Sequence, residues 1–218
     1  MKITNTIVLG ALLLVGLAAW AQEYPLAEGS LDYSYARYAP SGPYTNGHSL
    51  NGGGGSFVLN IFENEYVGIK GDLQGYGSTT SHFVIPSSST FPGGATANVQ
   101  GNLFTYLFGP QLKIRAHKVQ PFGHLLFGGA HSNVYGNAFK TICQPMVGAC
   151  AFSKAPAGNA FAMAFGGGVD IPIGKRVFLR PGEIDYLMTN FNNQFNSGLQ
   201  NNFRYSAGIN FTFTNGSH

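Results

Sequence analysis

The chain has 218 residues, enough for one domain, and few of them are charged: Asp, Glu, Lys and Arg make up 10% of the residues, and the formal net charge is +3. Such a small and scattered charge does not indicate a nucleic-acid partner. Aromatic residues make up 14%, and glycine occurs 31 times. No interior stretch approaches the roughly 18 consecutive apolar residues of a membrane helix. Few charges with many aromatics instead suit a membrane barrel built of strands.

The N-terminal residues 1–21 have the features of an export signal. Lys2 gives a positive start, residues 7–19 form a short apolar core, and Ala19-Trp20-Ala21 fits the small-x-small pattern of a cleavage site. The alternative is an N-terminal anchor helix, which needs a longer apolar core. We therefore expect a cleaved signal peptide over residues 1–21 and one domain over residues 22–218.

Eight segments alternate apolar and polar residues with a period of two, which is typical of β-strands with two different faces. The expected strands are residues 31–38, 53–62, 66–76, 102–115, 119–132, 159–173, 177–189 and 202–213. In residues 177–189 the alternation requires a bulge near Pro181 and Gly182, so that Arg180, Glu183 and Asp185 share one face.

The connections between these segments alternate in length. Tight turns are expected at residues 63–65, 116–118 and 174–176, and longer loops at residues 39–52, 77–101, 133–158 and 190–201. Short periplasmic turns and long external loops are the rule in outer-membrane barrels. The loop over residues 77–101 is rich in Ser, Thr and Gly, and we expect it to be solvated and adaptable.

A soluble sandwich also alternates, but two features favour a barrel. Several segments have about ten residues or more, the length of a tilted membrane crossing. Lys70, Asp72, Lys113 and Arg204 fall on the face with small residues, whereas the large apolar side chains form the other face. In a barrel the apolar face meets lipid and the polar face fills the interior. The predicted fold is an all-β, eight-stranded, antiparallel up-and-down transmembrane β-barrel.

Three segments strengthen this interpretation: Tyr106–Gln111 (YLFGPQ), Glu183–Tyr186 (EIDY) and Phe203–Phe213 (FRYSAGINFTF). With the signal peptide, they resemble the small eight-stranded outer-membrane barrels of the OmpA/OmpX type, the outer membrane protein beta-barrel family. The resemblance implies that the last strand carries the signal read by the barrel-assembly machinery. The residues that would carry this signal are Tyr205, Ile209, Phe211 and Phe213. Residues 214–218 follow Phe213, whereas the family pattern usually ends on the aromatic residue.

The same resemblance implies a location in the outer membrane of a Gram-negative-type bacterium. It also implies a monomer that contacts outer-membrane lipid and lipopolysaccharide and meets the barrel-assembly machinery during biogenesis. No cofactor is expected, and the sequence names no ligand for the external loops.

Charged residues of both signs fall on the expected inner face. They are Asp32, Lys70, Asp72, Lys113, Arg115, Glu183, Asp185 and Arg204. They could line an ion path or form a paired network that fills the interior. We favour the network, because an eight-stranded barrel is just wide enough for side chains to fill. The sequence predicts that His124 also points inward.

Cys143 and Cys150 lie in the longest expected loop. Two cysteines in an exported chain favour one disulfide over a metal or redox site, which would need more ligands.

His131-Ser132-Asn133 resembles, imperfectly, the His-x-Ser-Asn element of the lipid A deacylase PagL. Adjacent residues on a strand point to opposite faces, so His131 and Ser132 should not meet. We therefore expect a non-enzymatic barrel with a structural, binding or adhesion role. A lipid A-modifying enzyme and a narrow channel are the alternatives.

Overall fold

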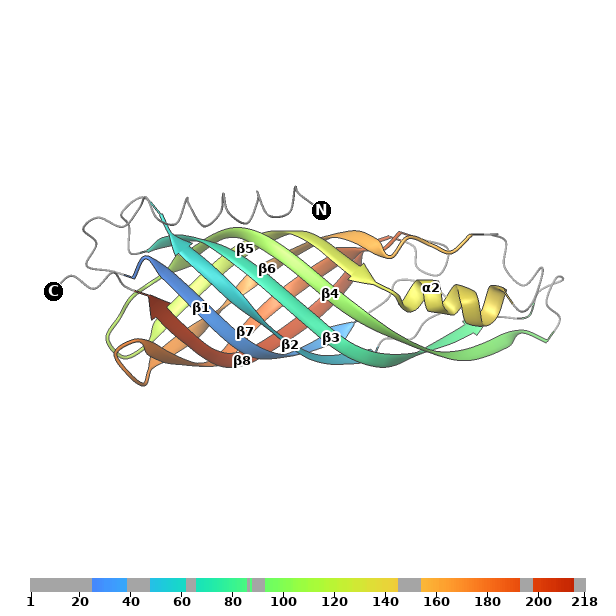
Figure 1. Ribbon diagram of the computed structural model, residues 1–218, viewed down its shortest axis with the longest axis horizontal. Coiled ribbons are helices and arrows are strands. Elements are labelled where there is room, and N and C mark those ends of the chain that lie inside the picture. Colours follow the sequence, from blue (N-terminus) through green and yellow to red (C-terminus); the bar gives the residue numbers. More distant parts are fainter. Residues whose placement is uncertain are drawn as a thin grey trace, which may run out of the picture.

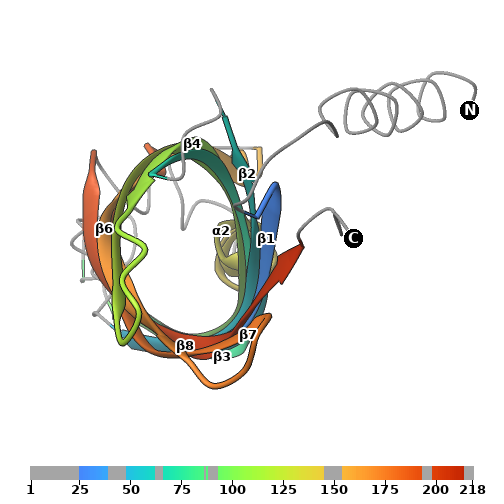
Figure 2. The ribbon, with the colours of Figure 1, turned by 90° about the vertical axis from the view of Figure 1, so that its left-hand side faces the viewer.

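The computed structural model describes residues 25–38, 48–61, 66–85, 87, 93–144, 154–192 and 198–213. In it, eight antiparallel strands follow one another around a closed barrel, which confirms the predicted fold class (Figures 1 and 2). The strands are β1 (Ala27–Tyr38), β2 (His48–Asn60), β3 (Val67–Ile85), β4 (Ala95–Lys113), β5 (Gln120–Ser132), β6 (Asn159–Pro172), β7 (Val177–Asn190) and β8 (Gln200–Phe213). The predicted signal peptide lies outside the described residues. No helix in the described ranges is long and apolar enough to cross a membrane.

The barrel closes by pairing of the first strand with the last, with Leu31 of β1 opposite Ile209 of β8. Short connections join β2 to β3, β4 to β5 and β6 to β7 at the end where β1 begins. We call this end the turn end. The opposite end, where the longer connections lie, is called the loop end.

The period of two separates the interior from an apolar outer surface. In β3, Lys70 and Asp72 are buried, whereas Leu73 between Asp72 and Gln74 is 56% exposed. The same alternation continues on β4, where Phe108 and Leu112 are more than half exposed. Because the large apolar side chains point away from the interior, the outer surface has the composition of a lipid-facing barrel wall.

The predicted irregularity of β7 is present. The register between β7 and β8 shifts between Arg180 and Glu183, and both of these side chains are buried inside the barrel. The bulge adds the residue needed to bring Arg180 and Glu183 to the inner face together with Asp185.

One expectation about the loops was wrong. Residues 77–101 are mostly not a solvated loop, because β3 and β4 extend beyond the barrel as a long hairpin (Figure 1). Thr79 pairs with Gly101 and Ile85 pairs with Ala95, after a register shift between Tyr76 and Thr79. The hairpin forms because its inner face, with Phe83 and Val99, is buried.

The partner of that inner face is a short helical segment that the sequence analysis did not predict. Helix α2 (Val134–Ala138) continues directly into a π-helical turn, η1 (Phe139–Cys143). Figure 2, which looks along the barrel, shows α2 within the outline of the ring of strands. Tyr135, Ala138 and Ile142 belong to the same apolar cluster as Phe83 and Val99. This segment therefore covers the loop end of the barrel.

A glycine allows the helix to approach β4. A Cβ atom on Gly101 would lie 2.2 Å from Cγ2 of Val134, at the start of α2. Asn133 fixes the same point, since its Oδ1 accepts a hydrogen bond of 2.7 Å from the backbone N–H of Asn102.

Candidate functional site

The barrel interior consists of two layers with different chemistry. Near the turn end it is filled by charged side chains, which we call the charged layer. Toward the loop end it is filled mainly by apolar side chains, with a hydrogen-bonded group of Thr189, Gln200 and Asn202 among them, and it is covered by α2 and η1; we call this the apolar layer. The members of the charged layer are Glu28, Asp32, Lys70, Asp72, Lys113, Arg115, His124, Asp170, Arg180, Glu183, Asp185 and Arg204.

The part of the charged layer nearest the turn end is centred on Lys113. Its Nζ lies 2.6 Å from Oε2 of Glu28 and 2.7 Å from Oδ2 of Asp170. Arg115 also contacts Glu28, and Asn210 donates a hydrogen bond of 2.8 Å to that carboxylate. Strands β1, β4, β6 and β8 are thus joined through buried polar groups.

Arg180 connects this part to the rest of the charged layer. Its Nε donates to Asp170 at 2.8 Å, and one terminal nitrogen donates to Glu183 at 2.9 Å. The guanidinium group also lies over the ring of Phe122, 4.4 Å from its centroid. A buried charge is stable only with partners. The bulge that turns Arg180 inward is therefore compatible with folding because these partners are present.

The second half of the charged layer contains Lys70, His124 and Arg204. Lys70 Nζ lies 2.6 Å from Glu183 Oε1, and His124 Nε2 lies 2.8 Å from Asp185 Oδ1. Arg204 donates to Asp185 at 2.7 Å and to Asp72 at 2.8 Å. These contacts extend the chain of ion pairs across the full width of the barrel.

Gly166 makes the contact between His124 and Asp185 possible. In the sheet, His124 of β5 is opposite Gly166 of β6, which in turn is opposite Asp185 of β7. A Cβ atom on Gly166 would lie 2.2 Å from Oδ1 of Asp185. The missing side chain therefore leaves room for the histidine and the carboxylate to meet above the middle strand.

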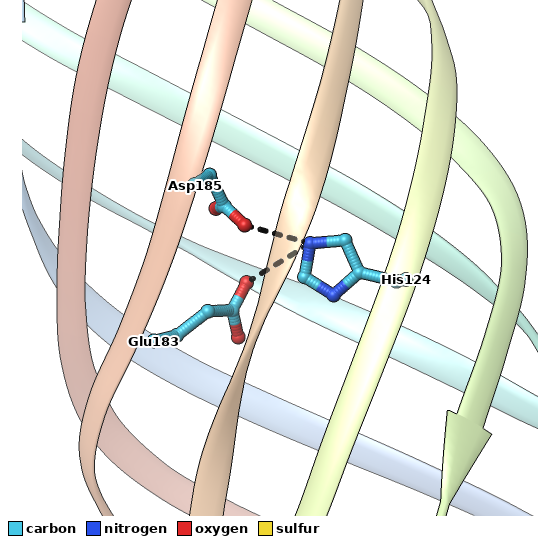
Figure 3. A group of neighbouring side chains, drawn as sticks. All are labelled: His124, Glu183 and Asp185. Carbon is cyan, nitrogen blue, oxygen red and sulfur yellow. Dashed lines mark hydrogen bonds and ion pairs between the residues drawn. The ribbon is translucent and has the colours of Figure 1, made fainter.

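His124, Glu183 and Asp185 could in principle hold a metal ion, because their ligand atoms lie within 4.8 Å of one another (Figure 3). The surrounding charges oppose this. Glu183 already binds Lys70 and Arg180, and Asp185 already binds Arg204. A divalent cation would be placed beside these positive groups or would have to displace them. The arrangement fits an ion-pair network better than a metal site.

The structure brings the charged residues singled out in the sequence into one connected layer. Sequence analysis missed Glu28 because the first strand was expected to begin at Leu31. The alternation of Glu28, Ser30 and Asp32, all buried, continues the polar face and could have extended that strand. It also missed the aromatic rings of Phe122 and Phe178, which lie inside the barrel beside Arg180 and Lys113.

The apolar layer was not expected either, since the inner face was predicted to carry small and polar residues. Small and branched side chains from the strands pack there against Tyr135 of α2, whose ring lies 5.5 Å from that of Phe191. The strand members include Leu103, Leu107, Leu126, Ala130, Ala162, Ala164 and Leu187. Because α2 and η1 keep water from these positions, apolar residues are stable on the inner face. The apolar layer separates the charged layer from the loop end.

His131 and Ser132 point to opposite faces of β5. His131 is exposed, with its Nδ1 2.7 Å from Oδ1 of Asn159. Ser132 is buried, and its hydroxyl accepts a hydrogen bond from the backbone N–H of Val134. The hydroxyl of Ser132 therefore serves the start of α2 and is not activated by the adjacent histidine.

The remaining predictions concern the two cysteines and the last strand. Cys143 is buried at the end of η1, whereas Cys150 lies outside the described residues, so the disulfide stays a prediction. On β8, Tyr205, Ile209 and Phe213 are exposed on the outer surface, and Phe211 is half-buried. Their role as an assembly signal also stays a prediction.

No family model and no curated protein matches the sequence. The structure is similar to Neisserial surface protein A, with a TM-score of 0.58 and 12% identity, over 86% of this chain and 97% of that one. It is also similar to the outer membrane protein OprG from Pseudomonas aeruginosa, with a TM-score of 0.53 and 10% identity, over 88% of this chain and 98% of that one. The first is called a surface protein and the second an outer membrane protein, and identities this low establish the fold alone. The chain has the fold of the small eight-stranded outer-membrane β-barrels.

Proposed function

We propose that the protein is a non-enzymatic barrel of the bacterial outer membrane that holds a binding surface at the cell exterior. In this proposal the barrel is a rigid anchor, and the loop end is the part that acts. The observation that carries the proposal is the combination of a filled interior with a hairpin and helix that extend beyond the barrel.

The outer surface and the connections support this location. Exposed apolar side chains surround the barrel, and lipid is the environment in which such a surface is stable. Short connections at one end and longer ones at the other support an orientation with the turn end in the periplasm. The predicted signal peptide over residues 1–21 supports export. Lipopolysaccharide and the barrel-assembly machinery are the expected partners of a monomer in this location.

The filled interior argues against a channel. Ion pairs such as Lys70 with Glu183 occupy the charged layer, and the apolar layer lies between it and the loop end. A continuous column of water would have to pass through both layers, so we favour an anchor over a narrow pore.

The external part favours binding over a purely structural role. The hairpin of β3 and β4 extends past the last residue of β5, since Leu103 of β4 pairs with Ser132 and residues 95–102 continue beyond it. The segment α2–η1 supports this hairpin from its inner side. An anchor alone would not need a built structure beyond the membrane.

A lipid A-modifying enzyme is the second candidate, and the positions of His131 and Ser132 do not favour it. A nucleophile and its base must lie within hydrogen-bond distance. Here the serine is directed inward and the histidine outward.

The test has two measurements on cells that produce the protein. A cysteine placed at Thr96, on the exposed face of the hairpin, should react with a membrane-impermeant maleimide on intact cells. A cysteine at His117, in the turn end, should react only after the outer membrane is opened. Mass spectrometry of lipid A should show the same acylation with and without the protein. A labelled His117→Cys on intact cells would contradict the orientation, and a change in lipid A acylation would favour the enzyme.

A further inference from the structure

We infer that a groove at the loop end, between the β3–β4 hairpin and the segment α2–η1, binds an anionic saccharide. The groove has a volume of about 450 Å³. Its polar lining consists of Thr80, Asn98, Gln100, Asn137, Lys140 and Thr141. This inference rests on the proposed function, because it requires that the loop end face the exterior.

The walls of the groove are held in place by hydrogen bonds and by apolar packing. Asn137 of α2 donates a hydrogen bond of 2.8 Å to the backbone carbonyl of Gln100 in β4. On the hairpin, His82 and Asn98 contact each other at 2.7 Å. Beneath the groove, Ile142 and Val99 are buried in the apolar cluster. A groove fixed in this way loses little conformational freedom when a ligand binds.

The chemistry of the lining fits a saccharide. Amide side chains both donate and accept hydrogen bonds, and hydroxyl groups do the same, so the lining can match the hydroxyl groups of a sugar. Thr80, Gln100 and Thr141 are exposed and supply such groups from both walls. Val99 is the one apolar residue among those that line the groove, so the side chains of the lining offer a lipid chain or an apolar peptide little to pack against.

The charge distribution indicates that the saccharide is anionic. No Asp or Glu occurs between Asp32 and Glu63, between Asp72 and Asp170, or after Asp185. The acids of the described chain therefore lie in the charged layer, away from the loop end, whereas Arg37, Lys140 and Lys154 are exposed on the loop-end side. Lys140 lies in the groove, and the sequence between Asp72 and Asp170 has no carboxylate that would compete with a ligand for its ammonium group. Its ammonium group is a suitable partner for a phosphate or sulfate on a sugar.

Two sources could supply this chemistry: the phosphorylated sugars of lipopolysaccharide in the same membrane, and a soluble anionic polysaccharide outside the cell. Binding is measured on the folded, full-length mature protein in detergent, with fluorescent dextran sulfate and neutral dextran of the same length. A second arm uses nanodiscs that contain lipopolysaccharide with or without its phosphate groups. We expect at least tenfold weaker binding of neutral dextran. Binding to dextran sulfate, to phosphorylated lipopolysaccharide, or to both supports the groove and identifies the source.

Matched variants distinguish binding in the groove from a general effect of surface charge. Lys140→Gln and Gln100→Glu should each weaken binding at least fivefold. Lys154→Gln and Gln144→Glu make the same changes at exposed positions outside the groove and should alter binding less than twofold. Each variant must keep the gel-mobility shift of a folded barrel. The inference is overturned if neutral dextran binds equally well, if the controls lose as much affinity as the groove variants, or if none of the anionic probes binds. If Thr96→Cys is labelled on intact cells, the proposed function holds even when one of these results overturns the inference.

Discussion

Lys70 of β3 and Glu183 of β7 meet inside the barrel, with Nζ 2.6 Å from Oε1 and both side chains buried. These strands are four places apart in a closed ring of eight, so the ion pair joins opposite walls. Glu183 also accepts a hydrogen bond from Arg180. One carboxylate thus contacts two buried cations, of which Arg180 also binds Asp170, and it links the two sides of the barrel.

Replacing Glu183 with Gln should strongly destabilise the barrel. The change leaves Lys70 and Arg180 without their shared carboxylate, and removing one partner of a buried pair costs about 3–5 kcal/mol. Urea titration of the refolded protein, followed by the gel-mobility shift, measures the loss. Lys118→Gln, which removes an exposed charge at the turn end, should change the midpoint little. The double variant Lys70→Met/Glu183→Leu should be more stable than Glu183→Gln, and an equally unstable double variant would contradict this account.

The strands and their inner faces could be predicted because the two environments of a membrane barrel are opposite in polarity. Lys70, Asp72 and Arg204 can be buried only inside, whereas Phe108 and Leu112 are stable against lipid. Even the bulge at Pro181 was predictable, since Arg180 and Glu183 must share a face. In these segments the alternation of polar and apolar residues matches the alternation of interior and lipid-facing positions.

The loop end could not be predicted because its stability depends on contacts between distant segments. The extension of β3 and β4 is rich in Ser, Thr and Gly, and it is stabilised by Phe83 and Val99 packing on α2. The helix has too few residues to show a period of its own. The groove inferred at Lys140 arises only when these two segments are together, so no motif in the sequence marks it.

Zinc should not stabilise the protein, although His124, Glu183 and Asp185 lie close together. The two carboxylates are already bound to Lys70 and Arg204, which would repel the ion. Thermal unfolding measured with and without a tenfold excess of ZnCl₂ should give the same midpoint, and His124→Gln should not alter this comparison. A zinc-dependent rise in the midpoint that disappears in His124→Gln would show that the cluster is a metal site.

Gly101→Leu should displace the segment α2–η1 while leaving the barrel folded. A side chain at this position would overlap Val134, where α2 begins. Trypsin should then cleave faster after Lys140, and mass spectrometry of the fragments measures the rate. Gly136→Ala is the matched control, because a Cβ there meets no atom within 4 Å and alanine favours the helix by up to about 1 kcal/mol. It should slow this cleavage, and equal cleavage in both variants would contradict the predicted role of Gly101.

Mass spectrometry without reductant should find Cys143 linked to Cys150 in exported protein. Cys143 ends η1, next to the buried Ile142, so the bond would hold this end of the segment in place. Cys150→Ser should therefore speed cleavage after Lys140 without changing the urea midpoint of the barrel. Two free thiols in the exported wild-type protein would rule out the disulfide.

The last prediction concerns conductance. In planar bilayers the wild-type protein should show no large, steady, porin-like current, because water and ions would have to cross both interior layers. The charged layer is closed by pairs such as Arg204 with Asp72 and Asp185, and apolar side chains such as Leu107, Leu126 and Leu187 fill much of the apolar layer. The two layers should act in series. Lys70→Ser/Glu183→Ser removes one ion pair that crosses the charged layer, and Gly101→Leu disturbs only the cover of the apolar layer, so neither variant alone should conduct. The combined variant, which disturbs both layers, should show frequent current steps. Steady conductance in the wild type, or in the Lys70→Ser/Glu183→Ser variant alone, would mean that the apolar layer does not close the barrel.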